Sequence, residues 1–138
     1  DLIVAHHPIM NCAWRPVQTI RSDDIQGRKL IRLIEYGIAA IAETLGGAGA
    51  RCFFEGRSWD VPSHKVPCVD TNGAGDAFWG AVLSSLRIQG VEQTSDLTEE
   101  VLRRAMEYGS AAGALTVQKK GAIPALPTRE EIEAFLAR

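Results

Sequence analysis

Asp70-Thr71-Asn72-Gly73-Ala74-Gly75-Asp76 lies between a short apolar run and a segment whose apolar residues recur at helical spacing. Its two glycines allow a sharp turn and a close approach of the main chain to a ligand. The first N–H groups of the following helix favour an anion, because they stand at the positive end of its dipole. Asp76 adds a carboxylate there, which fits a base that removes a proton from an attacking hydroxyl. A simple helix cap on a glycine turn is the plainer interpretation.

The length and composition are those of one soluble domain with a real core. The chain has 138 residues, of which 46% are hydrophobic and 23% charged, and its formal net charge is −2. The absence of a basic stripe argues against nucleic acid as a partner. No apolar run approaches the roughly 20 residues of a membrane span, so no membrane partner is expected. Scattered Cys12, Cys52 and Cys68 indicate reduced thiols in a cytoplasmic protein.

The N-terminal third predicts a strand, a loop, a helix and a second strand in that order. Leu2–Ala5 reads as a buried strand, and residues 9–22 show no clear period. A helix capped by Asp23 or Asp24 follows. Residues 38–42 are nearly all apolar, as central strands of a parallel sheet are.

A second glycine-rich turn follows that strand, at Thr44-Leu45-Gly46-Gly47-Ala48-Gly49. Ligands in open α/β sheets bind outside the carboxyl ends of the strands, so this turn is a candidate ligand site. A hairpin connection explains the same pattern, because residues 50–55 are also strand-like and Gly56 can turn the chain. Both interpretations stay open. Residues 58–61 and 65–69 are expected to be further short strands.

Three helices are predicted in the C-terminal half. The first runs from about Asp76 to Ile88, and its expected core face is Phe78, Val82, Leu83 and Leu86. The second begins at Asp96 or Thr98 and carries a run of small residues, 110–114, which fits either a flat ligand or close helix packing. Thr128 and Glu131 form a capping box that begins a short terminal helix.

These motifs resemble the ribokinase-like (PfkB) family of carbohydrate kinases, whose signature is usually Asp-Thr-x-Gly-Ala-Gly-Asp. Residues 44–49 resemble the family's nucleotide loop, residues 108–117 its adenine-side helix and residues 121–128 its closing loop. The resemblance covers about residues 23–138. It implies an α/β fold that is the C-terminal part of a three-layer α/β/α sandwich, with the lid and the N-terminal half of the family absent.

The resemblance also implies residue roles, with ATP, Mg²⁺ and K⁺ as cofactors. Asp76 would be the general base for a sugar hydroxyl, and Gly73, Ala74 and Gly75 with the Asp76 amide would cradle the transferring phosphoryl group. The nucleotide would be lined by Thr44, Gly46, Gly49 and Gly75, with Ser110 against the adenine. The monovalent cation would take oxygens near Asp70, Asn72, Thr116, Lys119 and Gly121.

The chain departs from the family pattern in three respects. Family members are longer, and their N-terminal half supplies the sugar-binding residues and the lid. The family's Asn-x-x-Glu element, tied to its magnesium–phosphate network, is not completed here, because Asn11 is followed by no Glu three places later. Ser110 stands where the family more often has Asn or His. The chain also begins with Asp rather than Met, which indicates a piece of something longer.

The leading hypothesis is therefore ATP-dependent phosphorylation of a sugar or related small polyol. Residues 1–22 are interpreted as a strand plus an irregular segment, and residues 23–138 as the nucleotide-binding part. The alternative is a truncated, non-catalytic nucleotide-binding or structural remnant. A dinucleotide-binding oxidoreductase is disfavoured, because the third glycine and the preceding βαβ start are missing. The expected partners are a small sugar and, across an exposed apolar surface, a second copy or the missing N-terminal half.

Overall fold

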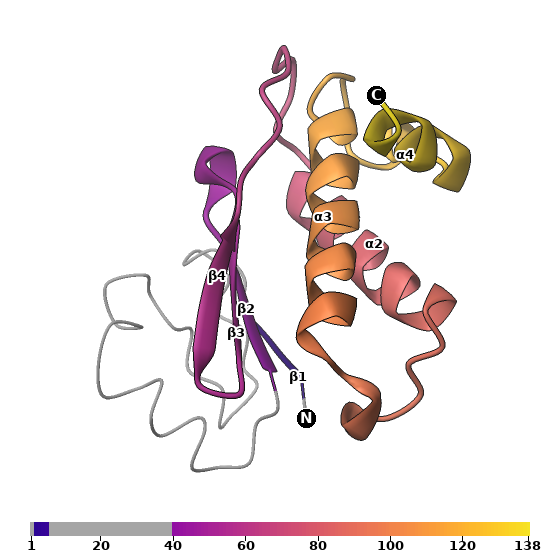
Figure 1. The fold of residues 1–138 in the computed structure, drawn as a ribbon. Coiled ribbons are helices and arrows are strands. Elements are labelled where there is room, and N and C mark those ends of the chain that lie inside the picture. Colours follow the sequence, from indigo (N-terminus) through magenta and orange to yellow (C-terminus); the bar gives the residue numbers. More distant parts are fainter. Residues whose placement is uncertain (1, 6–39) are drawn as a thin grey trace, which may run out of the picture. The chain divides into compact units, whose positions relative to one another are not determined.

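The computed structural model of the chain describes residues 2–5 and 40–138, drawn in colour in Figure 1. The chain divides into two compact units, Asp1–Asp60 and Val61–Arg138. The loop predicted over residues 9–22 and the helix predicted after Asp23 or Asp24 lie outside the described residues, as does Asn11. The first unit contains a sheet and the second contains helices.

The sheet has four strands in the order β1-β2-β3-β4. Their bounds are β1 Leu2–Ala5, β2 Ala40–Thr44, β3 Ala50–Phe54 and β4 Arg57–Val61. β1 pairs in parallel with β2, whereas β2 pairs antiparallel with β3. The glycine-rich turn after Thr44 is therefore the connection of a hairpin, which was one of its two sequence interpretations. β2 ends two residues later than the predicted apolar run.

β3 shows why this sequence forms a strand with one buried face. Ala50, Cys52 and Phe54 are buried, while the intervening Arg51 and Phe53 are half-buried, which is the two-residue period of a strand. A two-residue turn then leads into β4, with φ of +49° at Glu55 and +74° at Gly56. Positive φ at both central residues is what a tight hairpin turn of the favoured handedness needs.

Glu43 on β2 is a buried carboxylate whose ionisation opposes folding of the sheet. It is 6% exposed, and its register partner Arg51 already binds Asp60, with 2.6 Å between Nε and Oδ1. Burial raises the pKa of Glu43, and the nearby Arg51 only partly offsets this. A folded-state pKa above the unfolded value means that the folded protein binds the proton more tightly, so stability is lost as pH rises through the raised pKa.

We therefore expect Glu43→Gln to raise the free energy of unfolding near neutral pH by about 1 kcal/mol. The gain should shrink as pH falls toward the ordinary carboxyl range, where Glu43 is protonated in both states. Urea unfolding across that pH interval measures the difference. Glu55→Gln, an exposed carboxylate in the β3–β4 turn, is the control and should change little. A gain independent of pH would contradict the assignment to charge burial.

The second unit is built from three helices, α2 (Ala74–Ile88), α3 (Glu99–Thr116) and α4 (Arg129–Leu136). Short 3₁₀ turns occur at Thr94–Asp96 and Ile123–Ala125. α3 packs along α2 and also against α4 (Figure 1). The large buried apolar side chains on these helices are Phe78, Trp79, Val82, Leu86, Leu102, Met106 and Ile132.

Two predictions about this unit are wrong. Residues 65–69 form no strand, because Pro67 has no N–H to donate and the N–H groups of Val69 and Asp70 both go to the carbonyl of Val117 instead, at 2.7 and 3.2 Å. Leu83 is 52% exposed rather than in the core. It lies one residue past Val82, about 100° round the helix, and so turns away from the face that packs on α3.

Candidate active site

The start of α2 presents unpaired main-chain donors beside a carboxylate. Gly73 is the N-cap residue with φ +79°, a conformation that favours glycine, and its carbonyl accepts the first helical bond at 2.8 Å. The Ala74 N–H donates to the carbonyl of Thr71 at 3.3 Å. Within the part of the chain that the structure describes, the amides without an acceptor here are those of Gly73, Gly75 and Asp76. Asp76 is exposed in the first turn, so the site can hold an anion next to a proton acceptor.

Asp70 ties this loop to a segment far along the chain. Its Oδ1 accepts the Asn72 N–H at 3.0 Å and its Oδ2 accepts the Gly121 N–H at 2.9 Å. The Asn72 bond first, and the Gly121 bond second, hold the pKa of Asp70 below its ordinary value. The sequence pointed to oxygens near Asp70 and gave no sign that the carboxylate itself bridges two segments.

The predicted cation residues fall on these two joined segments. Asp70, Asn72 and Gly121 are brought together by the bonds just described. Thr116 is fully buried, with its hydroxyl donating to the Ala112 carbonyl at 2.9 Å and its own carbonyl accepting the Lys119 N–H at 3.1 Å. Over residues 40–138, no hydrogen bond ends on the main-chain carbonyls of Asn72, Lys119 or Gly121. Loop carbonyls that accept no hydrogen bond fit a hard cation, which prefers oxygen ligands.

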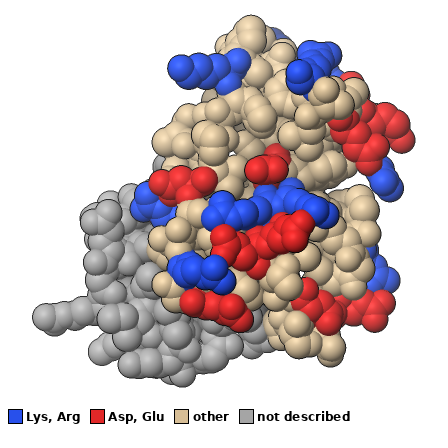
Figure 2. Space-filling model, in the orientation of Figure 1, with Lys and Arg blue, Asp and Glu red and all other residues tan. Residues whose placement is uncertain are grey.

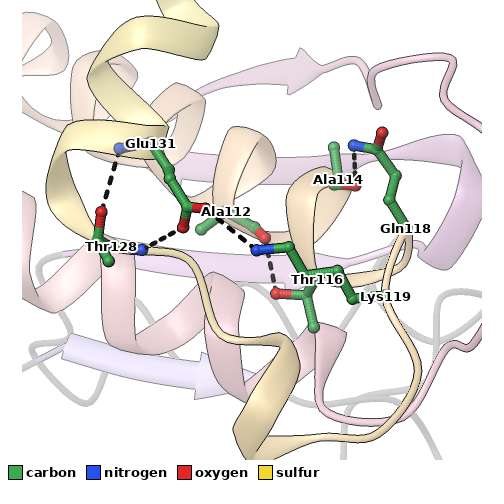
Figure 3. Close-up of polar contacts among 7 residues, drawn as sticks. All are labelled: Ala112, Ala114, Thr116, Gln118, Lys119, Thr128 and Glu131. Atoms are coloured by element: carbon green, nitrogen blue, oxygen red, sulfur yellow. Dashed lines mark hydrogen bonds and ion pairs between the residues drawn. The ribbon is translucent and has the colours of Figure 1, made fainter.

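A second polar connection joins the end of α3 to the beginning of α4 (Figure 3). Glu131 accepts the Thr128 N–H at 2.8 Å, and Thr128 accepts the Glu131 N–H at 3.3 Å, which is the predicted capping box. The other Glu131 oxygen accepts from Lys119 Nζ at 3.1 Å. The Thr128 bond first, and the Lys119 bond second, lower the pKa of Glu131. The Lys119 side chain is thus directed to α4.

The small residues of α3 are used for packing. A Cβ on Gly109 would stand 2.6 Å from Val82 Cγ2 and 2.9 Å from the carbonyl oxygen of Phe78, so α2 and α3 are in contact there. Ala111 and Ala112 are also buried. Close helix packing, one of the two sequence interpretations, therefore accounts for this part of the run.

Gly109→Ala is accordingly expected to lower the free energy of unfolding by about 2 kcal/mol, because the Phe78 carbonyl cannot move without shifting α2. Gly80→Ala is the matched control, since Gly80 is exposed inside α2 and a Cβ there meets nothing within 4 Å. It should stabilise by up to about 1 kcal/mol through helix propensity alone. Denaturant unfolding measures both, and equal effects of one sign would contradict the contact.

Ser110, the predicted adenine neighbour, is buried, and its hydroxyl donates to the Pro62 carbonyl at 3.1 Å. This bond links α3 to the segment after β4. Sequence analysis missed the contribution of Pro62, because a main-chain carbonyl leaves no residue-type signal.

Thr44, Gly46 and Gly49 belong to the first unit, where Thr44 ends β2. The Leu45 N–H donates to the Gly49 carbonyl at 2.7 Å and the Gly49 N–H to the Gly46 carbonyl at 3.0 Å, so the turn closes on itself. Gly46 and Gly49 both have positive φ. A Cβ on Gly46 would meet nothing within 4 Å, and residues 46–48 are exposed, so the outer side of the turn is open.

Acidic and basic side chains alternate on the face shown in Figure 2. On the helices, ion pairs join residues one helical turn apart, for example Glu99 with Arg103 on α3 and Arg129 with Glu133 on α4. Exposed pairs of this type stabilise by less than about 1 kcal/mol each. This face therefore carries no extended area of one sign. Among the described residues, no helix is both long and apolar enough to cross a bilayer.

Comparison with known proteins connects this geometry to a family. The sequence model described as "pfkB family carbohydrate kinase" matches residues 22–129, a range that contains the Asp70–Asp76 loop and the Gly121 segment. The chain belongs to the pfkB family of carbohydrate kinases. Fructokinase-1 of rice, Oryza sativa subsp. japonica, is 38% identical over 111 residues, which are 80% of this chain and 33% of that protein.

Solved structures of pfkB-type kinases have the same fold. A double mutant of fructokinase from Vibrio cholerae O395, in its fructose-, ADP- and potassium-bound form, is 28% identical with a TM-score of 0.69, over 86% of this chain and 35% of that one. A putative ribokinase II from E. coli in complex with ATP and Mg²⁺ is 30% identical with a TM-score of 0.65, over 79% and 32%. The predicted ribokinase-like α/β class is confirmed, and the chain spans about a third of the length of these relatives.

Proposed function

We propose that this chain is the C-terminal, ATP-binding part of a sugar kinase, and that residues 23–138 carry this function. The observation that supports the proposal most directly is the start of α2, where the Asp76 carboxylate stands beside the unpaired amides of Gly73, Gly75 and Asp76. Phosphoryl transfer depends mainly on positioning and on stabilising the charge of the transferring group. Fixed N–H donors that point at that charge both position the transferring group and stabilise its charge.

The proposed reaction transfers the γ-phosphoryl group of ATP to the acceptor hydroxyl. The oxygen of the acceptor hydroxyl bonds to the γ-phosphorus of ATP, its proton passes to the Asp76 carboxylate, and ADP leaves with the bridging oxygen and its electron pair. Gly73, Ala74 and Gly75 shape the cradle, in which the Ala74 amide is held by Thr71 while its neighbours face the phosphoryl group.

The residues proposed to contact the nucleotide are those that the family resemblance implies. Thr44, Gly46 and Gly49 would contribute the glycine turn, whose outer side is open. Gly75 would contribute a main-chain amide that has no acceptor within the described residues. Ser110 lies against the adenine side, where its oxygen is still able to accept a hydrogen bond although its proton is used on Pro62.

The described residues offer more ligands for a potassium ion than for Mg²⁺. Potassium suits the free carbonyls of Asn72, Lys119 and Gly121, with Asp70 and Thr116 shaping the two segments, and a bound cation would add positive charge next to the cradle. For Mg²⁺, residues 40–138 offer no cluster of three acidic, histidine or cysteine side chains. The Mg²⁺ ion would then enter with the ATP phosphates and keep several waters, as this ion commonly does.

The acceptor is proposed to be a sugar or a related small polyol, and fructose is the first to test, because rice fructokinase-1 and the Vibrio cholerae fructokinase are both named for it. The location is proposed to be cytoplasmic, where the thiols of Cys12, Cys52 and Cys68 would stay reduced. Self-association, or contact with a further part of a longer kinase, is also proposed, and the exposed apolar side chains of Val69 and Ile123 are the first to substitute in testing it.

The test is incubation of the chain with ATP, Mg²⁺, K⁺ and a panel of sugars beginning with fructose. ATP-dependent formation of a sugar phosphate is the expected result. Binding of MgATP without turnover on any sugar would favour the alternative, a non-catalytic nucleotide-binding remnant. Failure to bind ATP would reject both.

A further inference from the structure

We propose that the Asp70 carboxylate is a positioning group that holds the phosphate cradle in shape before the nucleotide arrives. This inference rests on the proposed function, because it assigns the cradle to a nucleotide phosphate. Its physical basis is the link between the loop at residues 70–76 and the segment at residues 117–122.

Contacts of three kinds make this link. Asp70 accepts from Asn72 within its own loop and from Gly121, which is 51 residues away in sequence. The N–H groups of Val69 and Asp70 both donate to the Val117 carbonyl. At Gly73, a Cβ would stand 2.9 Å from the Cβ of Ala122. The cap residue Gly73 therefore lies against Ala122, and the Asp70 bridge holds the two segments together next to it.

A carboxylate satisfies both donors because it has an acceptor oxygen for each of them. An ionised Asp offers acceptors on both oxygens, whereas Asn offers one oxygen and one NH₂ group. In Asp70→Asn, a donor would face either the Asn72 N–H or the Gly121 N–H, so one of the two bonds is lost. The loop or the Gly121 segment is then released, although the side chain keeps its size.

Release of the loop matters because the loop contains the cradle amides. Donors that are already in place cost no reorganisation when the phosphate arrives. A loop that must be ordered during binding subtracts that entropy from the affinity. The bridge therefore predicts weaker nucleotide binding when it is broken. A purely electrostatic role predicts the reverse, since loss of a negative charge near a phosphate tightens binding.

Asp96 is the matched control in the same unit. Its Oδ2 accepts the N–H groups of Glu92 and Gln93, both at 3.0 Å. It is likewise a carboxylate with two main-chain donors, but one oxygen accepts both of them, whereas Asp70 uses both of its oxygens. It lies beyond the C-terminal end of α2, while the cradle is at the N-terminal end.

The experiment measures MgADP affinity by calorimetry and amide hydrogen exchange by NMR on the 138-residue chain. Asp70→Asn should weaken MgADP by about tenfold, the loss of one charge-assisted hydrogen bond, and speed exchange at Asn72, Gly121 and Val69. Asp96→Asn keeps one oxygen that can accept both donors, so exchange at Glu92 and Gln93 and MgADP affinity should both stay unchanged. Asp70→Glu, which keeps both acceptor oxygens, should recover part of the affinity.

Three results would overturn the inference: unchanged or tighter MgADP binding in Asp70→Asn, an equal loss in Asp96→Asn, or no recovery in Asp70→Glu. Should the unsubstituted chain bind no MgADP, the proposed function fails by itself. The exchange measurement then still tests the bridge, because protection at Asn72 and Gly121 does not depend on nucleotide. Unprotected amides at both positions would reject it.

Discussion

Asp76→Asn is expected to reduce phosphoryl transfer by about 10²- to 10⁴-fold, the usual contribution of a positioned general base. Asparagine has the same shape as aspartate and accepts no proton from the sugar hydroxyl. It also removes a negative charge next to the phosphates, so MgADP should bind as well as before or more tightly. The two effects together separate a base from a residue that only holds the nucleotide.

The measurement compares kcat for sugar phosphate formation with MgADP affinity, on the same preparation. Glu107→Gln is the control, because Glu107 is an exposed carboxylate on α3 and its neutralisation should change neither quantity. Retained turnover in Asp76→Asn would reject Asp76 as the base. A large loss of MgADP affinity with a small loss of kcat would reassign it to binding.

Features that depend on neighbours in sequence were predictable. The Thr98 hydroxyl accepts the Val101 N–H at 3.2 Å, and Thr128 with Glu131 forms the reciprocal cap of α4. Both signals lie within one helical turn, so spacing alone contains them. Gly73 at the left-handed cap of α2 belongs to the same class, which is why the sequence pointed to Gly73 and Asp76 together.

Features that depend on distant segments were not predictable from the sequence. The pattern of β2 is equally that of a parallel central strand, and its antiparallel partner β3 is set by pairing rather than by residue type. Two features depend on where the end of α3 lies. They are the lack of a strand at residues 65–69, where the Val69 N–H donates to the Val117 carbonyl, and the bond from Gly121 to Asp70. A single sequence shows which groups can donate or accept, and the fold decides which of them meet.

Gly73→Ala is expected to lower the free energy of unfolding by about 3 kcal/mol, through two costs that add. Alanine at a φ of +79° pays about 1–2 kcal/mol for the left-handed conformation. The new Cβ also stands 2.9 Å from Ala122 Cβ and 3.0 Å from Ala122 Cα, and overpacking of this kind costs about 1–3 kcal/mol. Denaturant unfolding measures the sum.

Two further variants separate the costs. Gly90→Ala has almost the same φ, +82°, and no atom within 4 Å of the new Cβ, so it should show the conformational cost alone. Ala122→Gly in the Gly73→Ala background should relieve part of the clash, and the double-mutant cycle gives that coupling. If Gly73→Ala and Gly90→Ala were equally destabilising, Gly73 would not be in contact with the 117–122 segment. A coupling between Gly73 and Ala122 that also changes MgADP affinity would mean that this contact helps to set the cradle, since neither residue carries a side chain able to bind a phosphate.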